Sequence, residues 1–170
     1  ISWNNEILVI DNRFISERVN QLRMWGINFI HGDILDKDIV NKHCKNADVV
    51  HHLAGITDVP RLKSESENEQ DKKIKIVAQE GTQNILDAIS DKCKIVFPST
   101  HVVFEGIEKV KNDILEDENT KPILSYANSK DINEKQLINS GKNYVILRLG
   151  SVYGYSTDTA RIDIMPNLFS

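Results

Sequence analysis

Five short apolar runs, separated by segments of helical pattern, constrain the fold of this chain more than any other feature. Each run is rich in Val, Ile and Leu along its whole length, which is typical of strands in a parallel sheet that is covered on both faces. We therefore expect a parallel sheet between layers of helices. The runs are EILVID (6–11), INFIHGD (27–33), ADVVHHLAG (47–55), KIVFPST (94–100) and YVILRLG (144–150).

Three segments between the runs have apolar residues at helical spacing, namely 36–45, 69–90 and 126–139. Ser125 can cap the last of these helices, and Gly141 follows its end. Alternating strands and helices form βαβ units with right-handed crossovers. The sequence thus predicts an α/β fold with a doubly wound parallel sheet.

Composition excludes several classes of protein. The chain has 170 residues, enough for one domain with a proper core, and a net charge of −4 without a dominant basic block, so we expect no nucleic-acid partner. No apolar run is long enough for a membrane span, and we expect no membrane association. Cys44 and Cys93 are isolated, as in a reduced cytoplasmic protein. His51 and His52 point to opposite faces of one strand, so we expect no metal site.

Doubly wound sheets bind ligands at the carboxyl ends of their strands, so the residues that end the runs are candidates. Asp11, followed by Asn12, ends the first run and is placed to bind the hydroxyls of an adenosine ribose. Such an aspartate favours NAD over NADP because it repels a 2′-phosphate. The alternative is that Asp11 is a simple turn aspartate. Because Arg13 lies nearby and could bind a 2′-phosphate, NADP is the second choice of cofactor.

Two further strand ends carry candidates for cofactor binding. Asp33 could accept a hydrogen bond from the adenine amino group, with Ile34 against the ring. Ala54 and Gly55 offer close backbone approach to a cofactor, although a plain strand-to-loop turn explains them equally well.

Tyr126 and Lys130 are four residues apart on a predicted helix and so share one face. A phenol has a pKa of about 10, and a nearby ammonium group favours the phenolate, which can exchange a proton with an alcohol or a carbonyl. Thr100 ends the fourth run and could bond both substrate and phenol. The alternatives are an exposed helix pair and a threonine that caps a turn.

Seven stretches, in order along nearly the whole chain, carry a resemblance to a known family. They are VIDN, FIHGDILD, VVHHLAG, EGTQNILDA, VFPSTHVVFEG, SYANSK and LRLGSVYG. Together they resemble the extended short-chain dehydrogenase/reductases, in the branch of NAD-dependent nucleotide-sugar epimerases and dehydratases. The resemblance implies a Rossmann-like fold, NAD as the cofactor and a nucleotide-sugar substrate.

The resemblance also implies a role for individual residues. Asp11 and Asn12 match the adenosine-ribose site, and Asp33 and Ile34 match the adenine contact. Leu53, Ala54 and Gly55 match the backbone beneath the pyrophosphate and nicotinamide ribose, and Gly150 matches a contact to the nicotinamide. Thr100 and Ser151 match the substrate site. Thr100, Tyr126 and Lys130 match the catalytic residues, and Tyr126 and Lys130 also match cofactor contacts.

The chain departs from the family pattern in two ways. The glycine-rich pyrophosphate loop, expected upstream of EILVID, is missing, so we interpret residues 1–170 as an incomplete NAD-binding domain that lacks its first βα unit. Most of the substrate domain, expected after about residues 150–170, is missing as well. His101-Val102 stands where the family's 4,6-dehydratases carry Asp-Glu, which favours an epimerase over a dehydratase.

The resulting hypothesis is an NAD-dependent epimerase that acts on a nucleotide sugar through a transient keto intermediate. A sugar-nucleotide reductase or dehydrogenase is the near alternative. A non-catalytic dinucleotide-binding protein of the same fold, or a flavodoxin-like domain, is the alternative from another class. The family resemblance further implies a homodimer formed through helices 69–90 and 126–139.

Overall fold

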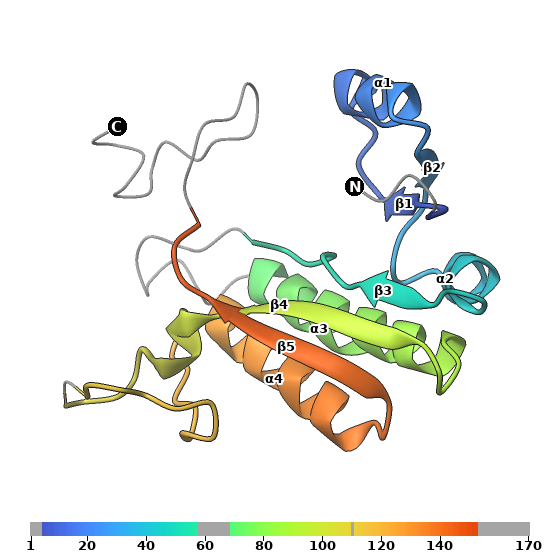
Figure 1. Cartoon of the computed structure of the whole chain (residues 1–170). Helices are drawn as coiled ribbons and strands as arrows, with labels where there is room; N and C mark the ends of the chain where they lie inside the picture. The colour runs from blue at the N-terminus through green and yellow to red at the C-terminus, as the bar shows by residue number, and fades with distance from the viewer. Residues whose placement is uncertain (1–4, 58–68, 110, 153–170) are drawn as a thin grey trace.

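The computed structural model describes residues 5–57, 69–109 and 111–152 (Figure 1). Strands and helices alternate along the chain, as the apolar runs predict. In order, they are β1 (Leu8–Asp11), α1 (Ser16–Met24), β2 (Asn28–His31), α2 (Lys37–Cys44), β3 (Val49–His51), α3 (Glu69–Ala88), β4 (Lys94–Thr100), a 3₁₀ helix (His101–Phe104), α4 (Ser125–Asn139) and β5 (Asn143–Leu149).

All strand pairs in the described residues are parallel, which confirms the predicted α/β class with a parallel sheet. The strands form two groups, β1 with β2 and β3 with β4 and β5 in that order. Within the described residues, β1 and β3 are not hydrogen-bonded to each other. Apolar side chains on these two strands are partly exposed, Leu8 to 37% and Val49 to 48%.

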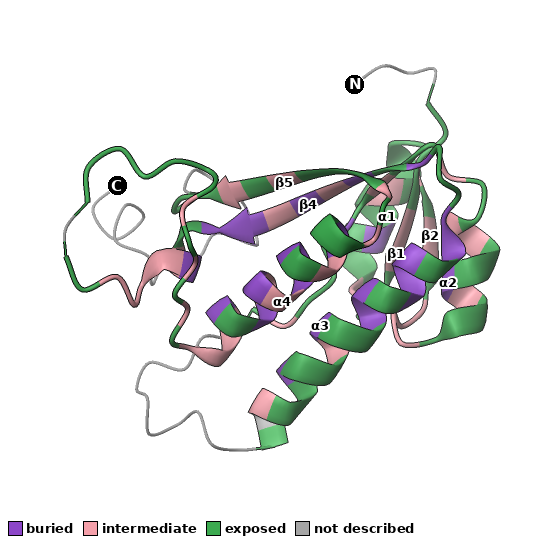
Figure 2. Ribbon diagram, turned by 90° about the horizontal axis from the view of Figure 1, so that it is seen from below, coloured by how far each residue is buried: buried purple, intermediate pink, exposed green. Residues whose placement is uncertain are grey.

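The core lies between β3–β4–β5 and the helices α3 and α4, which run along one face of this sheet (Figure 1). Ile95 and Phe97 lie two residues apart in β4, so both side chains point to the same face, the one covered by the helices. Both are fully buried. The buried faces of α3 and α4 turn toward the strands (Figure 2). Burial of this kind is the main favourable contribution to the stability of the fold.

The opposite face of β5 is open in the described residues. Val145, Leu147 and Leu149 are exposed to 39%, 41% and 40%. The prediction of strands covered on both faces is therefore not met by β5 within the part of the chain that the structure describes. The reason is that α3 and α4 pack on one side only (Figure 1).

Two local predictions differ from the structure. The sequence pattern does not predict α1, because this helix buries only Val19 fully and so has little amphipathic pattern. The prediction that Ser125 caps α4 is wrong, because Ser125 is the first helical residue and the N-cap Leu124 makes no side-chain cap. Gly141 does follow α4, with a positive φ of 69° that suits glycine.

None of the described helices combines the length and the apolar character that a membrane span requires.

Candidate functional site

Asp11, Asn12 and Asp33 meet at the carboxyl ends of β1 and β2. The Asn12 side chain donates a 2.9 Å hydrogen bond to Asp33 Oδ2, and this bond is the main cause of a lowered pKa at Asp33. Asp11 Oδ1 accepts the backbone N–H of Arg13 at 2.8 Å, the turn role that was the alternative for this residue. Two acidic side chains and an amide thus form one polar cluster at the strand ends.

The loop after Asp33 is held by α3 through two residues that the sequence analysis did not select. Asn84 donates to the backbone oxygen of Ile34 at 3.0 Å. A Cβ added at Gly81 would lie 2.8 Å from Ile34 Cγ2, so only glycine lets α3 come this close. The Ile34 side chain therefore packs on α3. The only signal for this contact in the sequence is the glycine inside a helical pattern.

The strand-end backbones predicted to lie near a cofactor are accessible. Leu53, Ala54 and Gly55 follow β3 and are exposed, Leu53 to 69%. Gly150 and Ser151 follow β5 and are also exposed. A Cβ added at Gly55 or at Gly150 would meet no atom within 4 Å, so the backbone at both positions is open to close approach.

Tyr126 and Lys130 lie on one face of the first turns of α4, both half-buried. Lys130 Nζ lies 5.9 Å from the centroid of the Tyr126 ring. The same ammonium group lies 4.6 Å from the centroid of Phe97 and donates to the backbone oxygen of Pro98 at 2.9 Å. The helix and β4 together hold this cation beside the phenol.

Burial lowers the pKa of Lys130 to about 8, while the carboxylate of Glu134 acts in the opposite direction. A lysine tuned in this way changes its charge close to neutral pH. Perturbed groups of this kind gather at functional sites, because proton transfer requires a pKa near the working pH.

Thr100 ends β4 and is buried, at 8% exposure. Its Oγ1 accepts the N–H of Val102 at 3.3 Å and caps the 3₁₀ helix, which is the alternative role considered for it. That helix and β4 both pack against α4. The structure thus brings Thr100 to the helix that carries Tyr126, and capping leaves the hydroxyl proton available for donation.

His51 and His52 point to opposite sides of the sheet, as predicted, and only His52 is buried. His52 Nε2 lies 2.8 Å from Thr82 Oγ1, and Asn133 donates to the same oxygen at 2.8 Å. A network of polar side chains therefore links β3, α3 and α4 beneath the candidate site. In the described residues, no three His, Cys, Asp or Glu side chains gather as a metal site would require.

The comparison with protein families matches residues 15–168 to the RmlD substrate binding domain. The chain belongs to this family. The resemblance to the extended short-chain dehydrogenase/reductases, first seen in the sequence motifs, is confirmed by this match and by the solved structures that share the fold.

Several solved structures are similar to this RmlD-family chain. The Bordetella bronchiseptica enzyme WbmG in complex with NAD is 25% identical, with a TM-score of 0.72 over 89% of this chain and 47% of that one. UDP-glucose 4-epimerase from Thermotoga maritima with UDP-glucose is 25% identical, with a TM-score of 0.68 over 85% and 47%. UDP-glucuronic acid 4-epimerase from Bacillus cereus in complex with NAD has the same fold at 24% identity, with a TM-score of 0.70 over 88% and 49%.

The RmlD-family chain spans about half the length of these solved chains. After Thr100 it carries His101, which is exposed and whose Nδ1 donates to the backbone oxygen of Leu149 at 3.2 Å. No carboxylate therefore occupies either of the two positions after Thr100, where the sequence analysis expected an acid pair in a dehydratase.

Proposed function

We propose that this protein is an NAD-dependent epimerase that acts on a nucleotide sugar through a transient keto intermediate. The observation that carries the proposal is the ammonium group of Lys130, half-buried beside the Tyr126 ring at the start of α4. A solvated helix pair would have no reason to bury a cation, because burial is unfavourable for the charged form. Similarity to NAD-bound enzymes and to UDP-sugar 4-epimerases supports the proposal.

The described residues fit NAD. The cluster of Asp11, Asn12 and Asp33 offers acceptors for the adenosine hydroxyls and the adenine amino group. The open backbone at Gly55 and Gly150 leaves room for the pyrophosphate and nicotinamide ends. The carboxylate of Asp11 favours NAD over NADP because it repels a 2′-phosphate. When bound, NAD supplies the acceptor and donor of the hydride.

In this proposal, side chains of the protein transfer the proton of the sugar hydroxyl. Tyr126 as phenolate takes the proton of the sugar hydroxyl while that carbon is oxidised. Lys130 stabilises the phenolate and, in this proposal, holds the nicotinamide ribose. Thr100 donates to the sugar oxygen, and Ser151 lines the substrate side. Tyr126 then returns the proton after the keto sugar has been reduced on its other face.

We further propose that residues 1–170 are part of a larger NAD-binding domain. The strand that carries the glycine-rich loop would pair between β1 and β3, the two strands that are not bonded to each other in the described residues. Partly exposed Leu8 and Val49 on these strands suit such a partner. The predicted substrate domain falls after residue 152, outside the described residues.

The choice of epimerase over 4,6-dehydratase rests on His101 and Val102, which stand in place of the Asp-Glu pair of the dehydratases. Val102 has no group that can transfer a proton, so the acid and base for water loss are not both present at these two positions. A sugar-nucleotide reductase is the second candidate, since it would use the same three catalytic residues. Epimerisation returns the cofactor to its starting state in each turnover, whereas a reductase consumes reduced cofactor. Turnover of a UDP-sugar without added reduced cofactor distinguishes the two.

The Tyr126→Phe substitution tests the proposal. It keeps the ring and its packing but removes the phenol oxygen, so turnover should fall by ~10²–10⁴-fold while NAD affinity stays the same. The measurement is chromatography of UDP-glucose and UDP-glucuronic acid, each incubated with the full-length protein. Tyr144→Phe, at an exposed tyrosine near the start of β5, is the matched control and should keep full activity. An active Tyr126→Phe enzyme would show that Tyr126 is not the catalytic acid and base.

Substitutions of the partners should give a distinct pattern. Lys130→Met should reduce both turnover and NAD affinity, and its residual activity should require higher pH, because the phenol loses its neighbouring cation. Thr100→Ser should be mild and Thr100→Val severe, because only the hydroxyl acts on the substrate. Equal effects of the two Thr100 substitutions would show that the Thr100 hydroxyl does not act in turnover.

A further inference from the structure

Glu134 is a buried carboxylate one helical turn after Lys130, with an exposure of 2%. Arg148 of β5 donates to it through Nη2 at 2.7 Å and through Nε at 3.2 Å to each oxygen. Ser99 of β4 donates its hydroxyl to the same carboxylate. One side chain of α4 is therefore bonded to two neighbouring strands.

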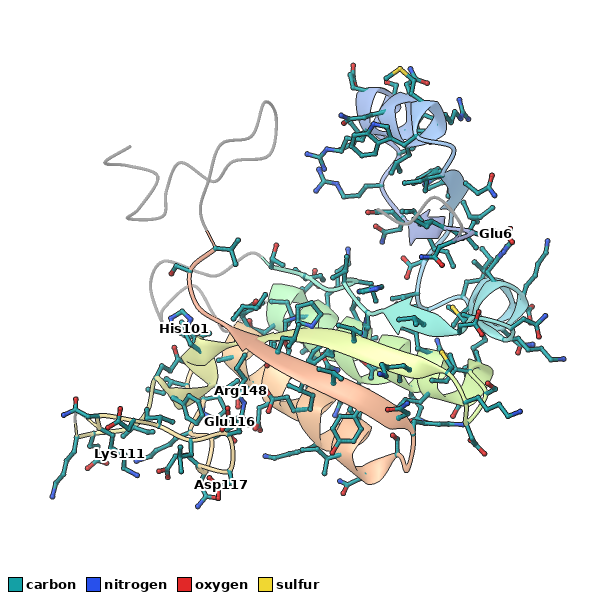
Figure 3. The ribbon with its side chains drawn as sticks, in the orientation of Figure 1. Glu6, His101, Lys111, Glu116, Asp117 and Arg148 are labelled. Atoms are coloured by element: carbon teal, nitrogen blue, oxygen red, sulfur yellow. The ribbon has the colours of Figure 1, made fainter. Side chains whose placement is uncertain are left out.

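The groups bonded to Glu134 lie next to the candidate catalytic residues. Ser99 directly precedes Thr100 in β4, and Arg148 lies opposite Ser99 in the register of β4 and β5. Gly150 follows Arg148 by two residues. Arg148 also donates through Nη1 to the backbone oxygen of Glu116 at 2.9 Å, and Figure 3 shows these two residues close together near the end of the sheet.

Stability alone is a weak reason for such a pair. The desolvation of two buried charges offsets much of their attraction, and well-packed apolar residues in their place are often neutral or stabilising. The pair does fix the relative orientation of the two side chains, because the planar guanidinium and the carboxylate fit each other in one geometry. A hydrogen-bonded charge pair thus restricts how α4 can lie on β4 and β5.

We propose that Glu134 is a positioning residue that holds Tyr126 and Lys130 on α4 in register with Thr100 on β4, through its bonds to Ser99 and Arg148. The proposal rests on the proposed function, since it assigns these three residues to one reaction. Nothing in the helix pattern distinguishes Glu134 from a solvated glutamate, so this role comes from the tertiary structure.

Glu134 also acts electrostatically on Lys130. Its carboxylate raises the pKa of Lys130, against the larger lowering by burial. Among the described residues, the ionisable groups near this ammonium include Tyr126 on the same helix and His52 at the end of β3. Loss of the Glu134 charge should therefore move the titration of Lys130 to lower pH.

The test begins with Glu134→Gln, which keeps the size of the side chain and removes its charge. We expect turnover of UDP-glucose or UDP-glucuronic acid to fall by roughly 10- to 100-fold, because small misplacements of reacting groups are costly, with KM unchanged within about threefold. The Lys130 titration, followed by NMR of ¹³C-labelled lysine in the full-length protein, should move to lower pH. Wild-type turnover together with an unchanged Lys130 titration would overturn the proposal.

Asp131→Asn is the matched control. Asp131 lies on the same helix and is buried to a similar degree, at 6% exposure, but its partners are Thr120 and Lys135 rather than β4 or β5. The control should lose some stability and leave both turnover and the Lys130 titration unchanged. A Lys130 shift of equal size in both variants would contradict a specific role for Glu134.

A double variant separates positioning from stability. Glu134→Leu with Arg148→Met replaces the pair by apolar groups and should fold at least as stably as Glu134→Gln. Positioning predicts that turnover stays low in this folded protein. Recovery of wild-type turnover would reduce the pair to a structural contact and overturn the proposal. An active Tyr126→Phe enzyme, by contrast, would defeat the proposed function whatever Glu134 does to Lys130.

Discussion

At the scale of single residues, His52 shows how burial sets the chemistry of a side chain. It is exposed to only 3%, and its Nδ1 has no hydrogen-bond partner in the described residues. Burial, with a smaller contribution from the charge of Lys130, lowers the pKa of His52 to about 4. The imidazole is therefore neutral in the folded protein at neutral pH.

This lowered pKa predicts acid sensitivity. Between pH 6.5 and about 4 the unfolded chain binds a proton at His52 that the folded protein does not, so the stability due to this residue falls as pH falls through this window. The loss between pH 7 and pH 5 should be about 2 kcal/mol. Urea unfolding at both pH values measures it.

His52→Gln removes the titrating group and should flatten this part of the pH dependence. His51→Gln, one residue earlier and exposed, is the control and should keep the wild-type slope. Identical slopes in the two variants would show that His52 is not the responsible group.

At the scale of elements, α4 depends on a cap from outside its own sequence. Glu105 Oε1 accepts the backbone N–H groups of Ile123 at 2.7 Å and Leu124 at 2.6 Å. These N–H groups precede the first helical residue, where a carboxylate also interacts favourably with the helix dipole. The loop between Glu105 and α4 is closed by a hydrogen bond from the backbone N–H of Gly106 to the backbone oxygen of Lys121 at 2.8 Å.

Removal of this cap should destabilise the protein. Glu105→Ala should lower the free energy of unfolding by ~0.5–2 kcal/mol, the range found for lost caps. Glu108→Ala should change it very little, because that glutamate is exposed and its ion pair with Lys121 lies on the surface. Urea unfolding of both variants at pH 7 measures the difference, and equal effects would mean that Glu105 does not cap α4.

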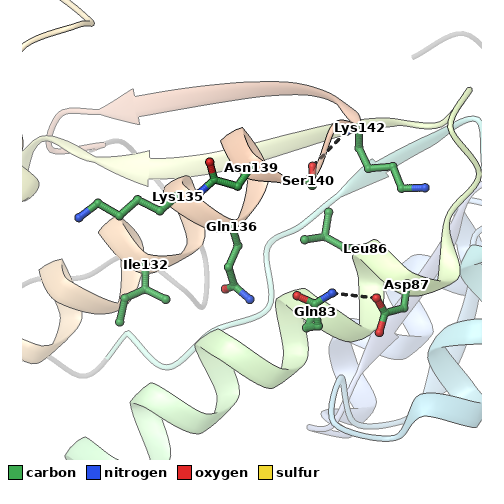
Figure 4. A pocket seen from close by; sticks show the side chains of 9 residues that line it. All are labelled: Gln83, Leu86, Asp87, Ile132, Lys135, Gln136, Asn139, Ser140 and Lys142. Carbon is green, nitrogen blue, oxygen red and sulfur yellow. Dashed lines mark hydrogen bonds between the residues drawn. The ribbon is translucent and has the colours of Figure 1, made fainter.

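At the scale of the whole molecule, α3 and α4 lie side by side and leave an outer groove between them (Figure 4). Its lining includes Gln83 and Asp87 from α3 and Lys135, Gln136 and Asn139 from α4. We propose that two copies of the protein pair here through both helices, as the family resemblance implies. A two-fold interface of this kind uses the same residues on both copies.

Sedimentation velocity of the full-length protein tests the pairing. The wild type should be a dimer at micromolar concentration. Asn139→Arg adds a cation in the groove of each copy and should shift the protein toward monomer, whereas Asn20→Arg on α1 should leave the dimer intact. A monomeric wild type would contradict the proposal.

Much of this fold could be predicted from local pattern. Each of the five apolar runs overlaps one observed strand, and the three helical patterns agree with α2, α3 and α4 to within two residues at either end. Candidate residues such as Asp11, Asp33 and Thr100 could be found because ligands bind where parallel strands end. Alternation along β3 also predicted that His51 and His52 face opposite ways.

Only the tertiary structure decided which polar groups meet. Glu105 caps α4 from 18 and 19 residues away, and Glu134 meets Ser99 across 35 residues. Local periodicity says which face of an element is apolar, but it does not say which element that face will touch. Those contacts depend on how distant segments pack. For the same reason α1, which has one buried residue, shows no amphipathic pattern in the sequence that would predict it.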